Sequence, residues 1–156
     1  MLPNGQLLAW EDELNEVLEE LKRSGEKLTR LKSLMLAGKI SKETYESLII
    51  KFEADASSAE KKRRALIESL SKSHKELSEQ AKLFENLILS LEAKLASSAV
   101  SEDHYVKIST ALKYGLEETI REMESVSSAL TELYKEAPEP NQYLIDRAMK
   151  RVEKGE

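Results

Sequence analysis

The 156-residue sequence contains no cysteine, only five glycines and three prolines, and few aromatic residues, which make up 5% of the chain. The absence of cysteine excludes disulfides, thiolate metal ligands and thiol nucleophiles together. Scarce glycine and proline, combined with 34% charged residues, are typical of long helices rather than of sheets joined by tight turns. No apolar run approaches the roughly 20 residues that a membrane span requires. The first residues resemble no export signal, so we expect a single cytoplasmic helical domain.

The charge is mildly acidic. There are 29 acidic and 24 basic residues, and residues 101–156 hold twelve of the acids and eight of the bases. Nucleic-acid-binding domains usually carry a basic surface. The balance of charge therefore does not favour nucleic acid as the default partner.

The apolar residues of the first segment recur every seven positions, which predicts a helix over residues 6–37. Seven-residue spacing gives a narrow apolar stripe, typical of a coiled-coil seam rather than of a globular core. Ser24 interrupts the second row and is followed by Gly25, where we expect a soft spot. The first row is Leu7, Leu14, Leu21, Leu28 and Met35, and the second is Trp10, Val17 and Leu31.

A second, much longer helix is predicted over residues 42–96, because no glycine or proline interrupts residues 41–100. The residues flanking its main apolar row change side near His74, so its two halves are expected to face different partners. Arg63 stands within this row, where it could set the register or reach an acid on a partner helix. The row is Ile49, Ala56, Arg63, Leu70, Leu77, Phe84 and Leu91.

Two further helices are predicted, over residues 101–136 and 141–153. The first has one row of Tyr105, Leu112, Val126 and Leu133 and another of Leu116, Met123 and Leu130. Pro138 and Pro140 then end it. The last helix is short, amphipathic and locally basic.

An internal repeat marks the two turns, because residues 40–45 (Ile-Ser-Lys-Glu-Thr-Tyr) align with residues 100–105 (Val-Ser-Glu-Asp-His-Tyr). Each copy joins an apolar helix end to a short turn, a serine N-cap and a tyrosine one turn into the next helix. Gly38 can close the first helix. The second turn lacks glycine, so we expect it to be looser or partly helical. The predicted turn residues are Gly38, Ile40, Tyr45, Val100 and Tyr105.

These patterns predict an all-α fold of elongated antiparallel coiled-coil hairpins, in which a long central helix carries two flanking helices. Residues 1–137 would form a rod with turns near 38–40 and 97–100, and residues 138–156 a proline-containing linker and the short basic helix. Because two-helix seams bury little area, we expect a dimer or higher oligomer. The predicted partner seam is Leu14, Val17, Leu21, Leu28, Leu31, Met35, Leu70, Leu77, Phe84 and Leu91.

No catalytic or cofactor-binding pattern is present. His74 and His104 are the only histidines, too few to predict a metal site. Adjacent carboxylates such as Glu117 and Glu118 point in different directions on a helix. We therefore predict no enzymatic activity, no cofactor, no metal and no small-molecule substrate.

Lys61, Lys62, Arg63 and Arg64 form the one basic cluster, and two interpretations of it remain open. It could contact the phosphates of nucleic acid or of an anionic membrane. It could instead be a solvated face with ion pairs such as Glu60–Arg64. The terminal basic helix could likewise dock on a groove or a lipid surface, or cover the end of the bundle.

The segment of residues 31–52 carries a resemblance to known families. Its pattern Leu-x-x-Leu-Met-Leu-Ala-Gly-Lys-Ile-Ser-x-Glu-x-Tyr-x-x-Leu resembles the hairpin of SHOCT-like short oligomerisation domains. It is also similar to the coiled-coil region of archaeal Cdv-type cell-division scaffolds, which work with ESCRT-III-like proteins, and residues 91–112 repeat it more weakly. The resemblance implies assembly or partner docking and implies no catalysis.

We therefore expect a non-enzymatic coiled-coil scaffold or adaptor that associates with itself and with helical proteins. The resemblance implies that its setting is archaeal cell division or membrane remodelling. The alternative is a nucleic-acid- or membrane-associated protein that uses Lys61–Arg64 and the terminal basic helix.

Overall fold

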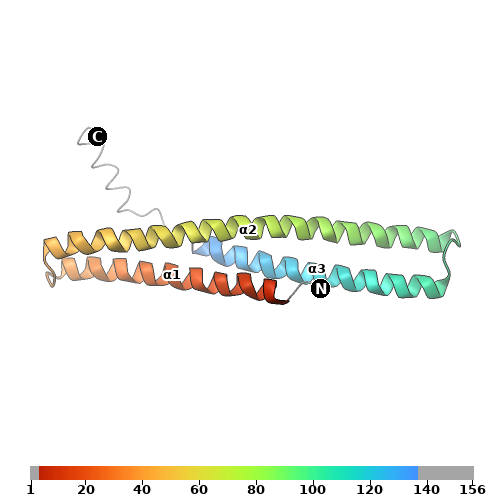
Figure 1. The fold of residues 1–156 in the computed structure, drawn as a ribbon, viewed down its shortest axis with the longest axis horizontal. Coiled ribbons are helices and arrows are strands. Elements are labelled where there is room, and N and C mark those ends of the chain that lie inside the picture. Colours follow the sequence, from red (N-terminus) through yellow and green to blue (C-terminus); the bar gives the residue numbers. More distant parts are fainter. Residues whose placement is uncertain (1–3, 137–156) are drawn as a thin grey trace, which may run out of the picture. The chain divides into compact units, whose positions relative to one another are not determined.

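A computed structural model describes residues 4–136, and all regular structure in that range is helical. The helices are α1 (Asn4–Leu36), α2 (Lys42–Ala96) and α3 (Glu102–Lys135), shown in Figure 1. The all-α prediction is confirmed, and the predicted helix boundaries differ from these by two residues at most. The predicted helix over 141–153 and the proline linker before it lie outside the described residues.

The turn between α1 and α2 closes as the sequence predicts. The Lys39 N–H donates to the Leu34 carbonyl and the Gly38 N–H to the Met35 carbonyl, at 3.0 and 3.1 Å. This Schellman arrangement satisfies the last carbonyls of α1, and Gly38 adopts the left-handed φ of 68° that it requires. Ser41 then caps α2, because its Oγ accepts the Thr44 N–H at 3.1 Å.

The turn between α2 and α3 corrects the expectation of a looser connection. The Ala99 N–H donates to the Lys94 carbonyl at 2.8 Å and the Ser98 N–H to the Leu95 carbonyl at 3.1 Å. These are the same two bonds as in the first turn. Ser98 takes the left-handed conformation there, with φ 63°, although a side chain makes this unfavourable by roughly 1–2 kcal/mol. The missing glycine thus leaves the turn geometry unchanged and adds local strain.

The chain divides into two compact units, and the first contains α1, the start of α2 up to Arg64 and the end of α3 from Leu133. Within unit 1, α1 runs antiparallel to α2 (Figure 1). α1 is unbroken at Gly25, the predicted soft spot, and Ser24 is buried at the position that lacks an apolar residue. The buried apolar core of unit 1 consists of Leu14, Val17, Leu31, Ile49, Ala59 and Leu133.

Unit 2 comprises Ala65–Glu132, that is, the second part of α2 and most of α3. The two gaps in the heptad rows of α3 fall at Ser109 and Thr119, and both residues are buried. Together with Tyr105, Leu112, Leu116 and Met123 they complete an uninterrupted alternation of three and four residues, which is the coiled-coil spacing. The buried apolar core of unit 2 consists of Leu66, Leu70, Ala81, Leu91, Val126 and Ala129.

Candidate interaction surface

Arg63 is buried in unit 1, with 8% of the residue exposed. Its Nε and Nη2 donate to the two carboxylate oxygens of Glu60 at 2.8 and 2.9 Å, and its Nη1 donates to the Leu133 carbonyl at 2.9 Å. Leu133 lies in the last turn of α3, where a helix leaves its carbonyls without backbone partners. Arg63 therefore caps α3 from α2, and this long-range bond fixes how far along α2 the end of α3 lies.

The ion pair with Arg63 sets the ionisation of Glu60. The hydrogen bond from Arg63 lowers the pKa of Glu60 from its usual 4.5, although partial burial of the carboxyl acts in the opposite direction. The same hydrogen bond raises the pKa of Arg63. Both groups are therefore charged at neutral pH, and the bidentate geometry is the strong form of this pair.

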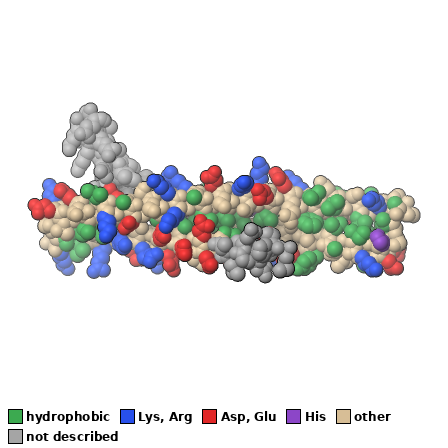
Figure 2. Space-filling model, viewed as in Figure 1, with side chains coloured by type: hydrophobic (Ala, Val, Ile, Leu, Met, Phe, Trp, Pro, Cys, Tyr) green, Lys and Arg blue, Asp and Glu red, His purple; other side chains and the backbone are tan. Residues whose placement is uncertain are grey.

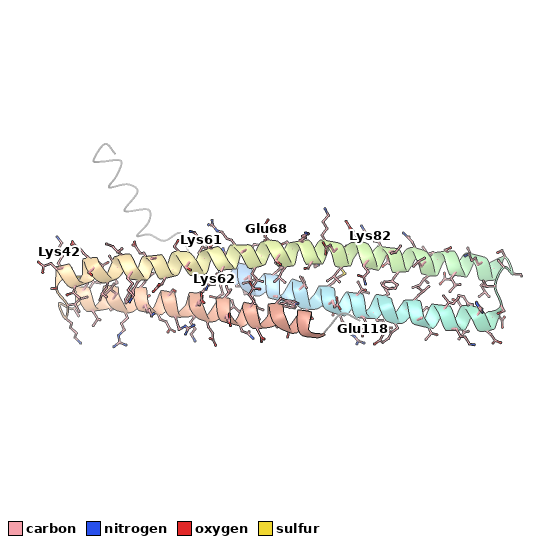
Figure 3. All side chains as sticks on the ribbon, in the orientation of Figure 1. Lys42, Lys61, Lys62, Glu68, Lys82 and Glu118 are labelled. Atoms are coloured by element: carbon pink, nitrogen blue, oxygen red, sulfur yellow. The ribbon has the colours of Figure 1, made fainter. Side chains whose placement is uncertain are left out.

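The rest of the basic cluster is largely engaged with acids of the same chain. Lys62 reaches from α2 to Glu20 on α1 at 3.0 Å, and Arg64 donates to Glu60 at 3.0 Å. Figure 3 shows Lys61 and Lys62 on α2, with Lys62 on the side of α1. Lys61 is exposed. The predicted Glu60–Arg64 pair is confirmed, and the cluster does not present four free cations on one face.

In unit 2, α2 and α3 are joined by a partly buried polar contact that lies beside a close approach of the two helices. The Thr119 hydroxyl donates to the Gly115 carbonyl at 2.8 Å and accepts a hydrogen bond from Gln80 Nε2 at 3.0 Å. One turn earlier, a Cβ added to Gly115 would lie 2.6 Å from Cε1 and Cζ of Phe84. Only glycine leaves room for that ring, so these two contacts together fix the register of α3 against α2.

Large apolar side chains are exposed on unit 2. Among the large apolar residues of α2 in this unit, Leu83 and Leu89 have the largest exposed fractions, at 59% and 62%, and Leu87 is 44% exposed. Figure 2 shows hydrophobic side chains gathered on the part of the surface that α2 and α3 form in this unit. Scattered apolar residues are normal on a surface, but a contiguous group is typical of an interaction site. On α3 the exposed large apolar residues are Val106, Ile108, Tyr114 and Ile120.

Three of these side chains lie on one side of the α2–α3 pair. Leu87 directly precedes the half-buried Ile88, and Ile108 directly precedes the buried Ser109. In an antiparallel pair, the residues at these flanking positions of both helices border the same side of the seam. Leu83 is four residues before Leu87 and shares its side of α2. We call Leu83, Leu87 and Ile108 the apolar face of unit 2.

The predicted partner seam is placed against the chain's own helices. Leu14, Val17, Leu31, Leu70 and Leu91 are buried, and Leu21, Leu28, Met35, Leu77 and Phe84 are half-buried. Their role as an oligomer seam stays a prediction.

The apolar face of unit 2 was missed, because its residues lie outside the heptad rows that guided the sequence analysis. Their large apolar side chains at flanking positions were the available signal. Of the predicted turn residues, Ile40, Tyr45, Val100 and Tyr105 are half-buried and Gly38 is exposed.

The described residues contain no group of three or more histidine, cysteine or carboxylate side chains able to hold a metal ion. No helix among residues 4–136 has the length and apolar character needed to cross a bilayer. The chemistry available on this part of the chain is that of helix packing, ion pairs and exposed apolar side chains.

Comparison with known proteins gives one match. A family model described as CdvA-like coiled-coil domain matches residues 9–154, nearly the whole chain. No curated protein and no solved structure is significantly similar to the chain. The match supports the Cdv-type part of the resemblance, and the SHOCT-like part is not shown.

Proposed function

Because the chain belongs to the CdvA-like coiled-coil domain family, we propose that it is a cell-division scaffold that associates with itself and docks helical protein partners. The family is of a non-catalytic scaffold type. The observation that carries the proposal is the family match over residues 9–154. The exposed apolar side chains of unit 2 support it, because a scaffold must keep binding surface available after its own helices have paired.

Two measurements test this proposal. Sedimentation velocity of the full chain should show association that increases with concentration in the micromolar range. A fluorescently tagged copy, expressed in the native cell, should concentrate at the site of division while cells divide. A chain that sediments as a monomer at every concentration and is spread evenly through dividing cells would contradict the proposal.

The alternative of phosphate binding through the basic cluster is not favoured by the geometry. Arg63 is bonded within unit 1, and Lys62 and Arg64 face carboxylates. The double substitution Lys61→Glu/Arg64→Glu tests the alternative without removing Arg63. A scaffold should keep its self-association and its partners, whereas a phosphate binder should lose its salt-dependent binding to DNA or to anionic vesicles.

A further inference from the structure

The apolar face of unit 2 has an acidic border at one end, whereas at the other end Lys94, seven residues after Leu87, is basic. Glu76 lies seven residues before Leu83, and Glu122 lies fourteen residues after Ile108, so each repeats the helical position of an apolar-face residue. Glu79 lies one helical turn before Leu83, and Glu118 lies one helical turn before Glu122, so both are on the same side of their helices as these residues. Among these four, Glu118 is paired with Arg121 at 2.7 Å, and Figure 3 shows Glu118 on α3.

The two units also differ in net charge. Unit 2 (65–132) contains twelve acidic and seven basic residues, a net charge of −5. The described part of unit 1 (4–64 and 133–136) contains thirteen of each and is neutral. A partner for the apolar face should therefore combine apolar side chains with positive charge.

The end of this same chain has that combination. Leu144, Ala148 and Val152 are spaced by four residues, with Ile145 and Met149 beside them in a helical projection. The basic residues Arg147, Lys150, Arg151 and Lys154 fall together on the adjacent side of that projection. We propose that residues 141–154 of one copy bind as an amphipathic helix to the apolar face of unit 2 of a second copy. This inference rests on the proposed self-association and names its contact.

The two surfaces match in length as well as in charge. The apolar residues from Leu144 to Val152 cover eight helical steps, about 12 Å. Along α2, the face extends from Leu83 to the level of Ile108. Ile108 lies opposite the buried Leu91, because Phe84 contacts Gly115 in this antiparallel pair, so the face also covers eight steps. A second copy of the face itself is a poorer occupant, because it would bring two acidic units together.

The contact is placed between two copies because the proposed function is self-association. From Glu122, the acidic-border residue of α3 nearest its end, to Lys135 is thirteen residues, about 20 Å along the helix. Residues 136–141 also span about 20 Å when fully extended. Linker length therefore does not separate the two arrangements, and the concentration dependence of sedimentation does.

A groove on unit 1 is the alternative site within one copy. It runs along α1 and reaches Glu136, directly before the terminal segment. Its charged lining residues are Lys22, Arg30, Glu26 and Glu136, which cancel, so it offers a basic helix no net attraction. A contact in which the end of one copy binds the middle of the next is heterologous, and repeating it gives a closed ring or an open chain of copies, depending on the rotation between neighbours.

The test uses full-length variants in sedimentation velocity. The face variant Leu83→Gln/Leu87→Gln and the tail variant Leu144→Gln/Val152→Gln should each raise the concentration of half-association at least about tenfold, as loss of a central apolar contact does. The control Leu89→Gln changes a side chain that is equally exposed on the same helix but lies off the face, and it should leave association unchanged. Circular dichroism checks that each variant remains helical.

Mixing gives the decisive result. A face variant retains an intact tail and a tail variant retains an intact face, so equal amounts should form dimers that grow no further. Charge exchange adds an independent check that leaves the apolar residues intact. Glu79→Lys/Glu122→Lys and Lys150→Glu/Arg151→Glu should each weaken association, and the chain carrying all four changes should recover it.

The outcomes separate this inference from the proposed function. If the wild-type chain associates but the face and tail variants associate equally well, the inference is wrong and the scaffold proposal stands. If the variants change the sedimentation of a monomer with no dependence on concentration, the tail binds within its own copy and the inference is also wrong. If the wild-type chain is a monomer at every concentration, the inference fails together with the self-association on which it rests, and the localisation experiment then decides the rest of the scaffold proposal.

Discussion

Replacing Gly115 by alanine sets two opposing effects against each other. Alanine is better than glycine inside a helix by about 1 kcal/mol, so the backbone term favours the variant. The new Cβ, however, would lie 2.6 Å from two ring carbons of Phe84, where carbon atoms prefer about 3.5–4.0 Å. The ring must therefore move by about 1 Å or leave the α2–α3 interface.

Overpacking of this kind costs about 1–3 kcal/mol. Subtracting the helix-propensity gain leaves a predicted loss of about 1 kcal/mol in the free energy of unfolding. Gly25 provides the matched control, because it is also a mid-helix glycine and a Cβ there would meet nothing within 4 Å. Gly25→Ala should therefore raise the free energy of unfolding by up to about 1 kcal/mol.

Urea unfolding followed by circular dichroism measures both variants. A double-mutant cycle with Phe84→Leu isolates the ring, and Gly115→Ala should cost about 2 kcal/mol less in that background than in the wild type, because the overpacking is relieved and the helix-propensity gain remains. If Gly115→Ala stabilises the chain as much as Gly25→Ala does, the close approach of Phe84 to α3 is not a constraint, and the reasoning on register in unit 2 fails.

Three other predictions use the same unfolding measurement. Ser98→Gly should stabilise the chain by up to about 1 kcal/mol, because it relieves the left-handed φ of 63°; no change or a loss would show that the turn is unstrained. Arg63→Met should destabilise it by about 2–3 kcal/mol, since the Leu133 carbonyl loses its side-chain donor and the Glu60 carboxylate keeps only Arg64 of its two partners, and a near-neutral result would contradict the capping role. The pKa of Glu60 is lower in the folded chain than its usual 4.5, so its contribution to stability is complete above that pH and is lost as the pH falls through the folded-state value. Glu60→Gln should therefore remove part of the acid dependence, and an unchanged profile between pH 7 and 3 would refute this.

The helices and their ends could be read from the sequence because local signals decide them. Seven-residue apolar spacing, the absence of glycine and proline from residues 41–100, and Ser41 as a cap all act within a few residues of each boundary. The second turn was misjudged for a physical reason. The Schellman hydrogen bonds outweigh the strain of one serine in the left-handed region, so glycine is favourable at this position but not required.

The polar positions within the seams were less predictable, because their partners are distant in sequence. The sequence shows that Arg63 interrupts an apolar row, but its acceptor is a carbonyl seventy residues away. Gaps at Ser109 and Thr119 look like defects in a heptad until the structure shows both buried, and Thr119 bonded to Gln80. Burial of a small hydroxyl at a seam position depends on the facing helix, which a single-helix pattern cannot describe.

These buried polar contacts also explain why the apolar face of unit 2 is available. An apolar seam alone tolerates sliding by whole heptads, whereas a bonded polar residue in a seam specifies one register. In unit 2 the Gln80–Thr119 bond and the Phe84–Gly115 contact select that register. In this register Gly115, which has no side chain, lies next to the ring of Phe84. Gly115 follows Ile108 by seven residues and therefore lies on the same side of α3. Sliding by one heptad would break the bond and drive the ring against a larger residue, so the residues that fix the seam also hold the apolar face in place.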